Sequence, residues 1–157
     1  MTVDGGADGG LADRAEILER FASFPEHLAD AARAAHGRAV PPGQWTPDLV
    51  VRHLIAVEGE VWQSRLAELA AGGEPRWSRM EPGPVGGFPN ASLDDLLAVF
   101  ANLRGGTIEF LRLFDLEPGG WARAGIHAVY GRLDVAGLIR VAVDHDDEHL
   151  SGLSLTD

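Results

Sequence analysis

Two histidines near the end of the chain, His145 and His149, have the spacing of a metal-binding pair. They belong to the segment Asp144–Leu150, which reads DHDDEHL and follows an apolar stretch. In an α-helix, residues four apart lie on the same face, with Cβ atoms roughly 5–6 Å apart. One helical turn could therefore present both imidazoles to one metal ion. A catalytic zinc normally has three protein ligands, so a third ligand must come from elsewhere in the chain.

His53 is the candidate for the third ligand. It stands three residues after Val50 and four residues before Val57, on the apolar stripe of a predicted helix. A residue on such a stripe points toward the core rather than into solvent. Leu138 and Ala142 precede His145 on the same helical face, so that pair is also expected to point inward. The three histidines together predict a metal site with a His₃ ligand set.

Each of these patterns has a plainer interpretation. Many solvated helix ends contain a His-x-x-x-His spacing, and the acids around His145 and His149 favour that alternative. A single histidine on an apolar helix face is more often a core residue bonded to a carbonyl. The segment also matches the H-x-x-E-H protease pattern. We interpret that match as accidental, and the acids as groups that could orient imidazole N–H groups.

Further candidate site residues lie in two irregular connections. His127 lies between residues 121 and 133, where it could be a pocket residue with a catalytic role, a partner that orients a metal ligand, or a loop-packing histidine. Arg76 and Trp77 lie in the Pro- and Gly-rich segment 74–91, and long ordered loops are often functional. With Arg79 they could line a pocket mouth and bind a cofactor. The alternative, that Trp77 holds the loop against the core, stays open.

Composition excludes several kinds of chemistry. The chain has no cysteine, which removes disulfides, thiolate metal sites and a cysteine nucleophile, and it has no lysine for a Schiff base or a P-loop. A net charge of −11 argues against a nucleic-acid partner. No apolar run approaches the roughly 18 residues of a membrane span, and we expect a cytoplasmic protein. We expect a disordered, Gly-rich lead over residues 1–10 and a single domain over residues 11–157.

Four amphipathic stretches predict the elements that position these residues. The first covers residues 11–35, with a kink or break expected at Pro25. The second is capped by Thr46 and should end near residue 71, before two glycines. The third begins at Ser92 and contains Gly105-Gly106, which suggest a close helix contact or a kink. The fourth covers about 134–153. With no hairpin signal, we predict an all-α four-helix bundle without a significant sheet.

The order of these motifs resembles the DinB/YfiT-like family over nearly the whole chain after residue 10. The residues that carry the resemblance are Trp45-Thr46-Pro47, Val51-Arg52-His53-Leu54, His127 with Gly131, and His145-Asp146-x-x-His149-Leu150. The resemblance implies a four-helix bundle of up-down-down-up topology, often a homodimer. It also implies a divalent metal, zinc or nickel, bound by His53, His145 and His149.

The resemblance also suggests classes of function. Characterised members are thiol-dependent transferases and isomerases that use bacillithiol, mycothiol or glutathione, and others are described as metal-dependent hydrolases. We therefore expect a metal-dependent enzyme that acts on a small-molecule substrate with a low-molecular-weight thiol. The Ala- and Arg-rich, lysine-free composition favours mycothiol, with bacillithiol as the other candidate. The alternatives are a hydrolase that uses metal-bound water and a non-catalytic, metal-binding dimeric module.

Overall fold

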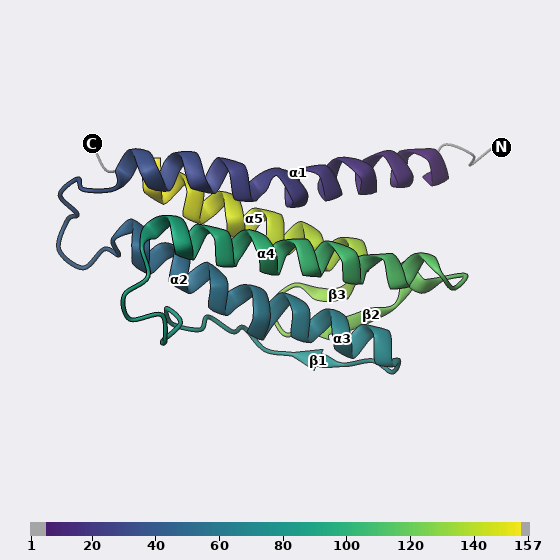
Figure 1. The fold of residues 1–157 in the computed structure, drawn as a ribbon. Helices are drawn as coiled ribbons and strands as arrows, with labels where there is room; N and C mark the ends of the chain where they lie inside the picture. Colours follow the sequence, from purple (N-terminus) through teal and green to yellow (C-terminus); the bar gives the residue numbers. More distant parts are fainter. Residues whose placement is uncertain (1–5, 155–157) are drawn as a thin grey trace.

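Four long helical segments form a bundle, seen in Figure 1. The structure is a computed structural model that describes residues 6–154, with side chains from Gly10 onward. The segments are α1 (Gly6–Ala35), the continuous run α2 (Pro47–Val57), η1 (Glu58–Gln63) and α3 (Ser64–Ala71), then α4 (Leu93–Leu111) and α5 (Val135–Ser154). In Figure 1, α1 and α5 run in one direction while the second and third segments run in the other. This confirms the predicted up-down-down-up bundle.

The first helix differs from its prediction in two ways. It continues through Pro25, so of the expected kink or break the break does not occur. It also begins at Gly6, within the segment expected to be a disordered lead, whereas residues 1–5 lie outside the described part of the chain. Each glycine costs about 1 kcal/mol of helix stability relative to alanine. Extending an existing helix is much easier than nucleating one, which offsets that local preference.

The second segment begins and ends where the sequence predicted. Thr46 Oγ1 accepts a hydrogen bond from the Leu49 N–H at 3.4 Å, and Gly72 ends the segment with a φ of 89°. An unpredicted π-helical stretch, η1, interrupts the α-helical pattern at Glu58–Gln63. Its hydrogen bonds run from residue i to residue i+5, which changes the faces that the following side chains occupy. Glu58, at the start of this stretch, is completely buried.

The third segment begins with a capping box. The Asp95 N–H donates to Ser92 Oγ at 3.1 Å, and the Ser92 N–H donates to the Asp95 carboxylate at 3.2 Å. The helix then continues through Gly105 and Gly106 without interruption. A Cβ at Gly105 would meet nothing within 4 Å, and one at Gly106 would meet only the Gln63 side chain at 4.0 Å. Neither glycine is therefore required by a close helix contact.

A small sheet covers one side of the bundle, although the chain is mostly helical, as predicted. Strand β1 (Arg76–Trp77) pairs in parallel with β2 (Ala124–His127), which pairs antiparallel with β3 (Gly131–Asp134). The register places Trp77 beside His127 and His127 beside Gly131. The β2–β3 loop has three residues followed by Gly131 at a φ of 74°, a hairpin type distinct from the two-residue turns. Strands this short show little alternation in the sequence.

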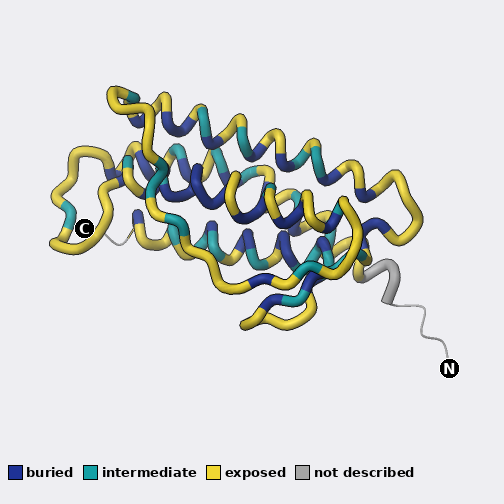
Figure 2. Tube along the Cα trace, turned by 90° about the horizontal axis from the view of Figure 1, so that it is seen from below, coloured by how far each residue is buried: buried dark blue, intermediate teal, exposed yellow. Residues whose placement is uncertain are grey.

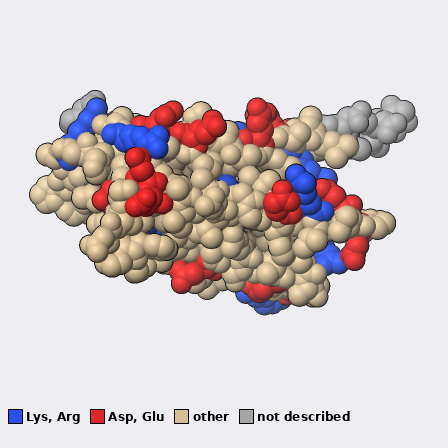
Figure 3. All heavy atoms as spheres, viewed as in Figure 1, with Lys and Arg blue, Asp and Glu red and all other residues tan. Residues whose placement is uncertain are grey.

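The core follows the inner sides of the helices, drawn in dark blue in Figure 2. Two apolar clusters fill it, one centred on Trp62, Leu66 and Leu138, the other on Leu28, Leu54 and Phe100. On the face shown in Figure 3, basic side chains occur in separate small groups beside acids. Among the described residues, no helix has the length and apolar character needed to cross a membrane.

Candidate metal centre

His53 is oriented by a backbone carbonyl of the segment that joins α3 to α4. Its side chain is 1% exposed, and its Nδ1 lies 2.7 Å from the Pro82 carbonyl oxygen. Because a carbonyl can only accept, Nδ1 carries the proton and Nε2 has a free lone pair. Nε2 is buried and has no hydrogen-bond partner among the described residues. This arrangement is the usual one for a metal-binding histidine, whose second ring nitrogen donates to a carbonyl or carboxylate.

The two α5 histidines meet His53 as the sequence predicted. His145 Nε2 and His149 Nε2 lie 3.3 Å apart. The His53 ring centroid is 4.7 Å from that of His149 and 5.5 Å from that of His145. His53 on α2 lies more than 90 positions before the two histidines of α5. The fold therefore brings the three imidazoles together.

Glu81 is a fourth member of this cluster, and the sequence analysis missed it. Its two carboxylate oxygens lie 3.3 Å from His145 Nε2 and 3.4 Å from His53 Nε2. One ligand atom from each of the four residues lies within 4.8 Å of the others. Glu81 directly precedes Pro82, whose carbonyl orients His53, so one stretch of loop supplies both groups. Helical spacing cannot indicate which loop acid will reach a helix.

The spacing of these atoms fits a bound cation. Zinc–nitrogen bonds of about 2.0–2.1 Å in tetrahedral geometry separate neighbouring ligand atoms by about 3.3–3.4 Å. The separations between His145 and His149, His145 and Glu81, and His53 and Glu81 are 3.3, 3.3 and 3.4 Å. These separations and the unpartnered Nε2 of His53 are those of a donor set that could hold a divalent metal ion.

A comparison with protein families identifies the family of the chain. The model of the DinB superfamily matches residues 11–152. The chain belongs to the DinB superfamily. The matched range includes His53, Glu81, His145 and His149, which we call the DinB cluster. A search of curated proteins found no match to the chain.

The electrostatics of the DinB cluster keep its two α5 imidazoles in the ligand form. Burial, with smaller contributions from His145 and His53, lowers the pKa of His149 to about 4. Burial also lowers the pKa of His145, although the neighbouring Glu81 carboxylate opposes that change. Neutral imidazole is the form that binds a metal. At neutral pH the two α5 histidines are therefore ready to bind without first losing a proton.

A buried network of ion pairs joins α4 to the two helical segments that carry the histidines of the DinB cluster. The sequence analysis did not predict it. The guanidinium of Arg104, on α4, donates to both carboxylate oxygens of Glu58 at 2.9–3.1 Å and to those of Asp146 at 2.9 and 3.1 Å. It also donates to the Phe21 carbonyl at 2.8 Å and lies over the Phe21 ring. Asp146 therefore pairs with Arg104 rather than with an imidazole.

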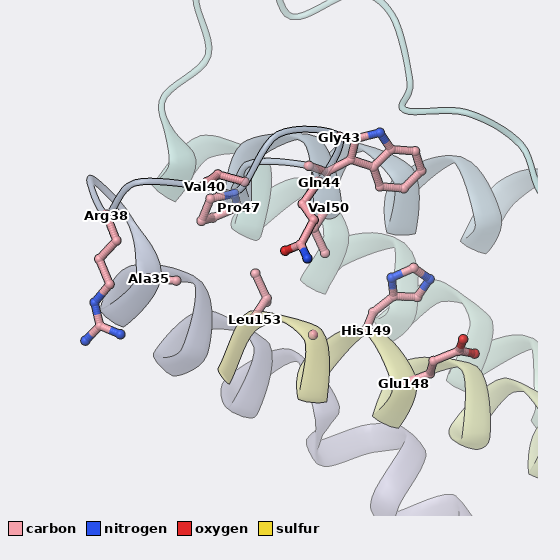
Figure 4. Close-up of a pocket in the computed structure, with 12 residues that line it drawn as sticks. Ala35, Arg38, Val40, Gly43, Gln44, Pro47, Val50, Glu148, His149 and Leu153 are labelled. Carbon is pink, nitrogen blue, oxygen red and sulfur yellow. The ribbon is translucent and has the colours of Figure 1, made fainter. Parts of the chain in front are cut away.

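Two cavities adjoin the DinB cluster on different sides. The larger, about 280 Å³, lies between α5 and the loop before α2, and Figure 4 shows His149, Glu148 and Leu153 on its α5 side. We call the smaller one, about 140 Å³, the inner cavity; it is lined by His145 and Glu81 together with Arg65, Arg79, His127 and Tyr130. The metal cluster can thus be reached from two directions.

His127 belongs to the inner cavity. It lies on β2 and is 3% exposed, and its Nδ1 accepts the backbone N–H groups of Val129 at 3.0 Å and Tyr130 at 3.3 Å. The proton of the neutral ring must therefore be on Nε2, which makes Nε2 a hydrogen-bond donor. Burial and the positive charge of Arg65 lower the pKa of His127 and keep it neutral. The structure places His127 in a cavity lining, and its catalytic role stays a prediction.

Arg76 and Trp77 lie away from the metal cluster and line neither of the two cavities. Trp77 is buried in β1, and a Cβ at Gly125 of the neighbouring strand would lie 2.6 Å from its ring. The indole thus holds the loop against the core, the alternative considered from the sequence. Arg76 is exposed on the same strand, and Arg79 alone of the expected group lines the inner cavity. A cofactor contact through Arg76 or Trp77 stays a prediction.

Proposed function

We propose that this protein is a metal-dependent enzyme that transfers a low-molecular-weight thiol to an electrophilic small molecule, with zinc or nickel at His53, His145 and His149. The observation that supports this proposal is the position of the cluster between two cavities. One cavity is lined by His149 and the other by His145 and Glu81. Two cavities that each contain cluster residues would give a thiol and an electrophile separate binding places beside the same centre.

Glu81 is the member of the cluster that a substrate atom could replace as a metal ligand. Its side chain is 47% exposed, whereas that of His53 is 1% exposed. It also lies on a connecting segment rather than a helix, so its carboxylate can move away and leave a position for a substrate atom. A catalytic zinc site needs such an open position, whereas a structural site is closed by four protein ligands. A displaced Glu81 carboxylate would remain near enough to accept a proton from the incoming thiol.

The thiol must come from a second molecule because the chain has no cysteine. A bound zinc or nickel ion supplies positive charge that lowers the pKa of a coordinated thiol and favours the thiolate. The residues of the chain would hold that ion and orient the electrophile in the inner cavity. The buried side chain of His53 would exclude water from one side of the ion. Mycothiol is the proposed thiol, on the basis of the resemblance and the composition, and bacillithiol is the second candidate.

The first experiment tests the metal site. Untagged protein would be purified, reconstituted with zinc at neutral pH and analysed for metal content. Alanine variants of His53, His145 and His149 should each lose most of the metal. His27→Ala and His36→Ala are matched controls, because both residues are exposed histidines outside the cluster. Equal zinc content in wild-type and His53→Ala protein would refute the three-histidine site.

The second experiment tests the reaction. Zinc- and nickel-loaded protein would be incubated with mycothiol, bacillithiol or glutathione and the electrophile 1-chloro-2,4-dinitrobenzene. In the expected reaction a carbon–sulfur bond forms, the carbon–chlorine bond breaks, chloride leaves and the thiol proton goes to solvent. Activity should require both metal and thiol. Metal-dependent cleavage of 4-nitrophenyl acetate without any thiol would instead support the hydrolase alternative.

A further inference from the structure

Arg65 is a buried cation without a carboxylate partner. It lies on α3, is 6% exposed and donates through Nη2 to the Ser78 carbonyl at 2.8 Å. Its guanidinium carbon lies 5.3 Å from the centroid of the Trp77 ring. Within residues 6–154 it forms no ion pair, whereas Arg104, which is still more deeply buried, pairs with two carboxylates. Burying a charge without a counter-ion is costly, so Arg65 is suited to receive an anion.

A second donor without an acceptor lies in the same cavity. His127 uses Nδ1 to accept two backbone N–H groups, so its Nε2–H has no partner among the described residues. Arg65 and His127 both line the inner cavity, and the charge of Arg65 acts on the His127 ring. A guanidinium and an imidazole N–H are thus presented together, a combination that binds a carboxylate through charge-assisted hydrogen bonds.

Charges of both signs line the inner cavity. Arg79 lines it together with Arg65, whereas Glu81, Asp144 and Glu148 would repel an anion placed beside them. Glu81 and Glu148 act on His145, at the metal end, whereas the charge that acts on His127 is that of Arg65. Arg65 itself is influenced by the exposed Glu68 and not by Glu81. An anion therefore has a favourable position at the Arg65 end and an unfavourable one beside His145.

We propose that the inner cavity binds the carboxylate group of a small anionic substrate, with the carboxylate against Arg65 and His127 and the reacting atoms toward His145 and Glu81. This inference rests on the proposed function, because it places the electrophile in this cavity and the thiol in the larger one. A carboxylate matches the planar fork of arginine donors. The volume of about 140 Å³ suits a small metabolite. A neutral analogue would leave Arg65 without its counter-ion.

The test uses NMR of the full-length protein with ¹⁵N-labelled arginine and histidine side chains. Acetate and its neutral isostere acetamide would be titrated into zinc-free and zinc-loaded protein. Acetate should shift the Arg65 Nε–H and His127 Nε2–H signals, and acetamide should leave them in place. Arg65→Gln should weaken acetate binding by about tenfold or more, the loss expected for a charge-assisted bond. Arg65→Lys should restore part of it.

The matched control is Arg140→Gln. Arg140 is exposed on α5 and lines neither cavity, so its replacement should leave acetate binding unchanged. Acetate that shifts neither signal in the zinc-loaded protein would overturn the inference while leaving the metal site intact. Tighter binding of inorganic phosphate than of acetate would overturn the assignment to a carboxylate. Acetate binding by zinc-free protein that fails to take up zinc would support the anion site and contradict the proposed function.

Discussion

Replacing Arg104 by methionine should strongly destabilise the protein at neutral pH. Arg104, Glu58 and Asp146 are 1%, 0% and 2% exposed, and Arg104 is the cation that neutralises both carboxylates. Removing one partner of a buried ion pair costs about 3–5 kcal/mol, because the other partner stays buried and unpaired. Here two carboxylates lose their partner, so we expect a loss in the upper part of that range. Small domains have a total stability of about 5–15 kcal/mol.

The loss should depend on pH in a direction that the structure specifies. Burial raises the pKa of Asp146 to about 7 even though Arg104 opposes this. A carboxyl group whose folded pKa lies above its unfolded value stabilises the protein fully below about pH 4, and this stabilisation is lost as pH rises to about 7. Removing Arg104 raises the folded pKa further. Arg104→Met should therefore cost more at pH 8, above the Asp146 pKa of about 7, than at pH 5.

Urea unfolding followed by far-UV circular dichroism at the two pH values would measure both effects. Thr107→Val is a milder companion, because Thr107 Oγ1 donates to Glu58 at 2.7 Å and its loss should cost about 1.5–3 kcal/mol. Arg33→Met is the control, since the Arg33–Asp94 pair between α1 and α4 is exposed and should contribute about 0–1 kcal/mol. A cost below 1 kcal/mol for Arg104→Met at pH 8, or an equal cost at both pH values, would refute the reasoning.

Three further predictions concern the metal, the sheet and the assembly. Zinc affinity should hold down to about pH 6.5 and fall below it, because the pKa values of His145 and His149 are lowered; chelator competition that shows the steepest loss above pH 7 would contradict this. Gly125→Ala should lower the free energy of unfolding in urea by about 1–3 kcal/mol, because its Cβ would clash with Trp77. Gly105→Ala, at an exposed position of α4, should raise that free energy by roughly 0.5–1 kcal/mol. Sedimentation should show a homodimer at high micromolar concentration, and a monomer would count against the family resemblance on this point.

The features that sequence analysis predicted correctly are those set by local rules. Thr46 and Ser92 begin helices because their side chains cap the first turn, and Gly72 ends one because its φ is positive. Apolar spacing placed His53 on the inner face of its helix, and helical periodicity paired His145 with His149. These relations act over a few residues, so the pattern of types along the chain is enough to indicate them.

The missed features depend on contacts between distant segments. Glu81 reaches the histidines from a loop whose path is set by tertiary contacts, including the bonds from Arg52 to the carbonyls of Gly87 and Phe88. Strands β1 and β2 are two and four residues long and pair across a large sequence separation. The burial of Glu58 depends on Arg104, 46 residues away. A charged residue is buried only where a partner elsewhere in the chain pairs with it. The local sequence therefore does not predict the buried position of Glu58.

The acids of the DHDDEHL segment show why its charge was misleading. Residues of an α-helix advance by about 100°, so consecutive positions face different surroundings. Asp146 turns into the core toward Arg104, Asp147 pairs with Arg20 on α1, and Glu148 lines both cavities beside the metal cluster. The helix end is therefore held on two sides by ion pairs while its histidines face α2. Because Arg104 also binds Glu58, five residues after His53, one guanidinium fixes the position of both helices that carry the histidine cluster.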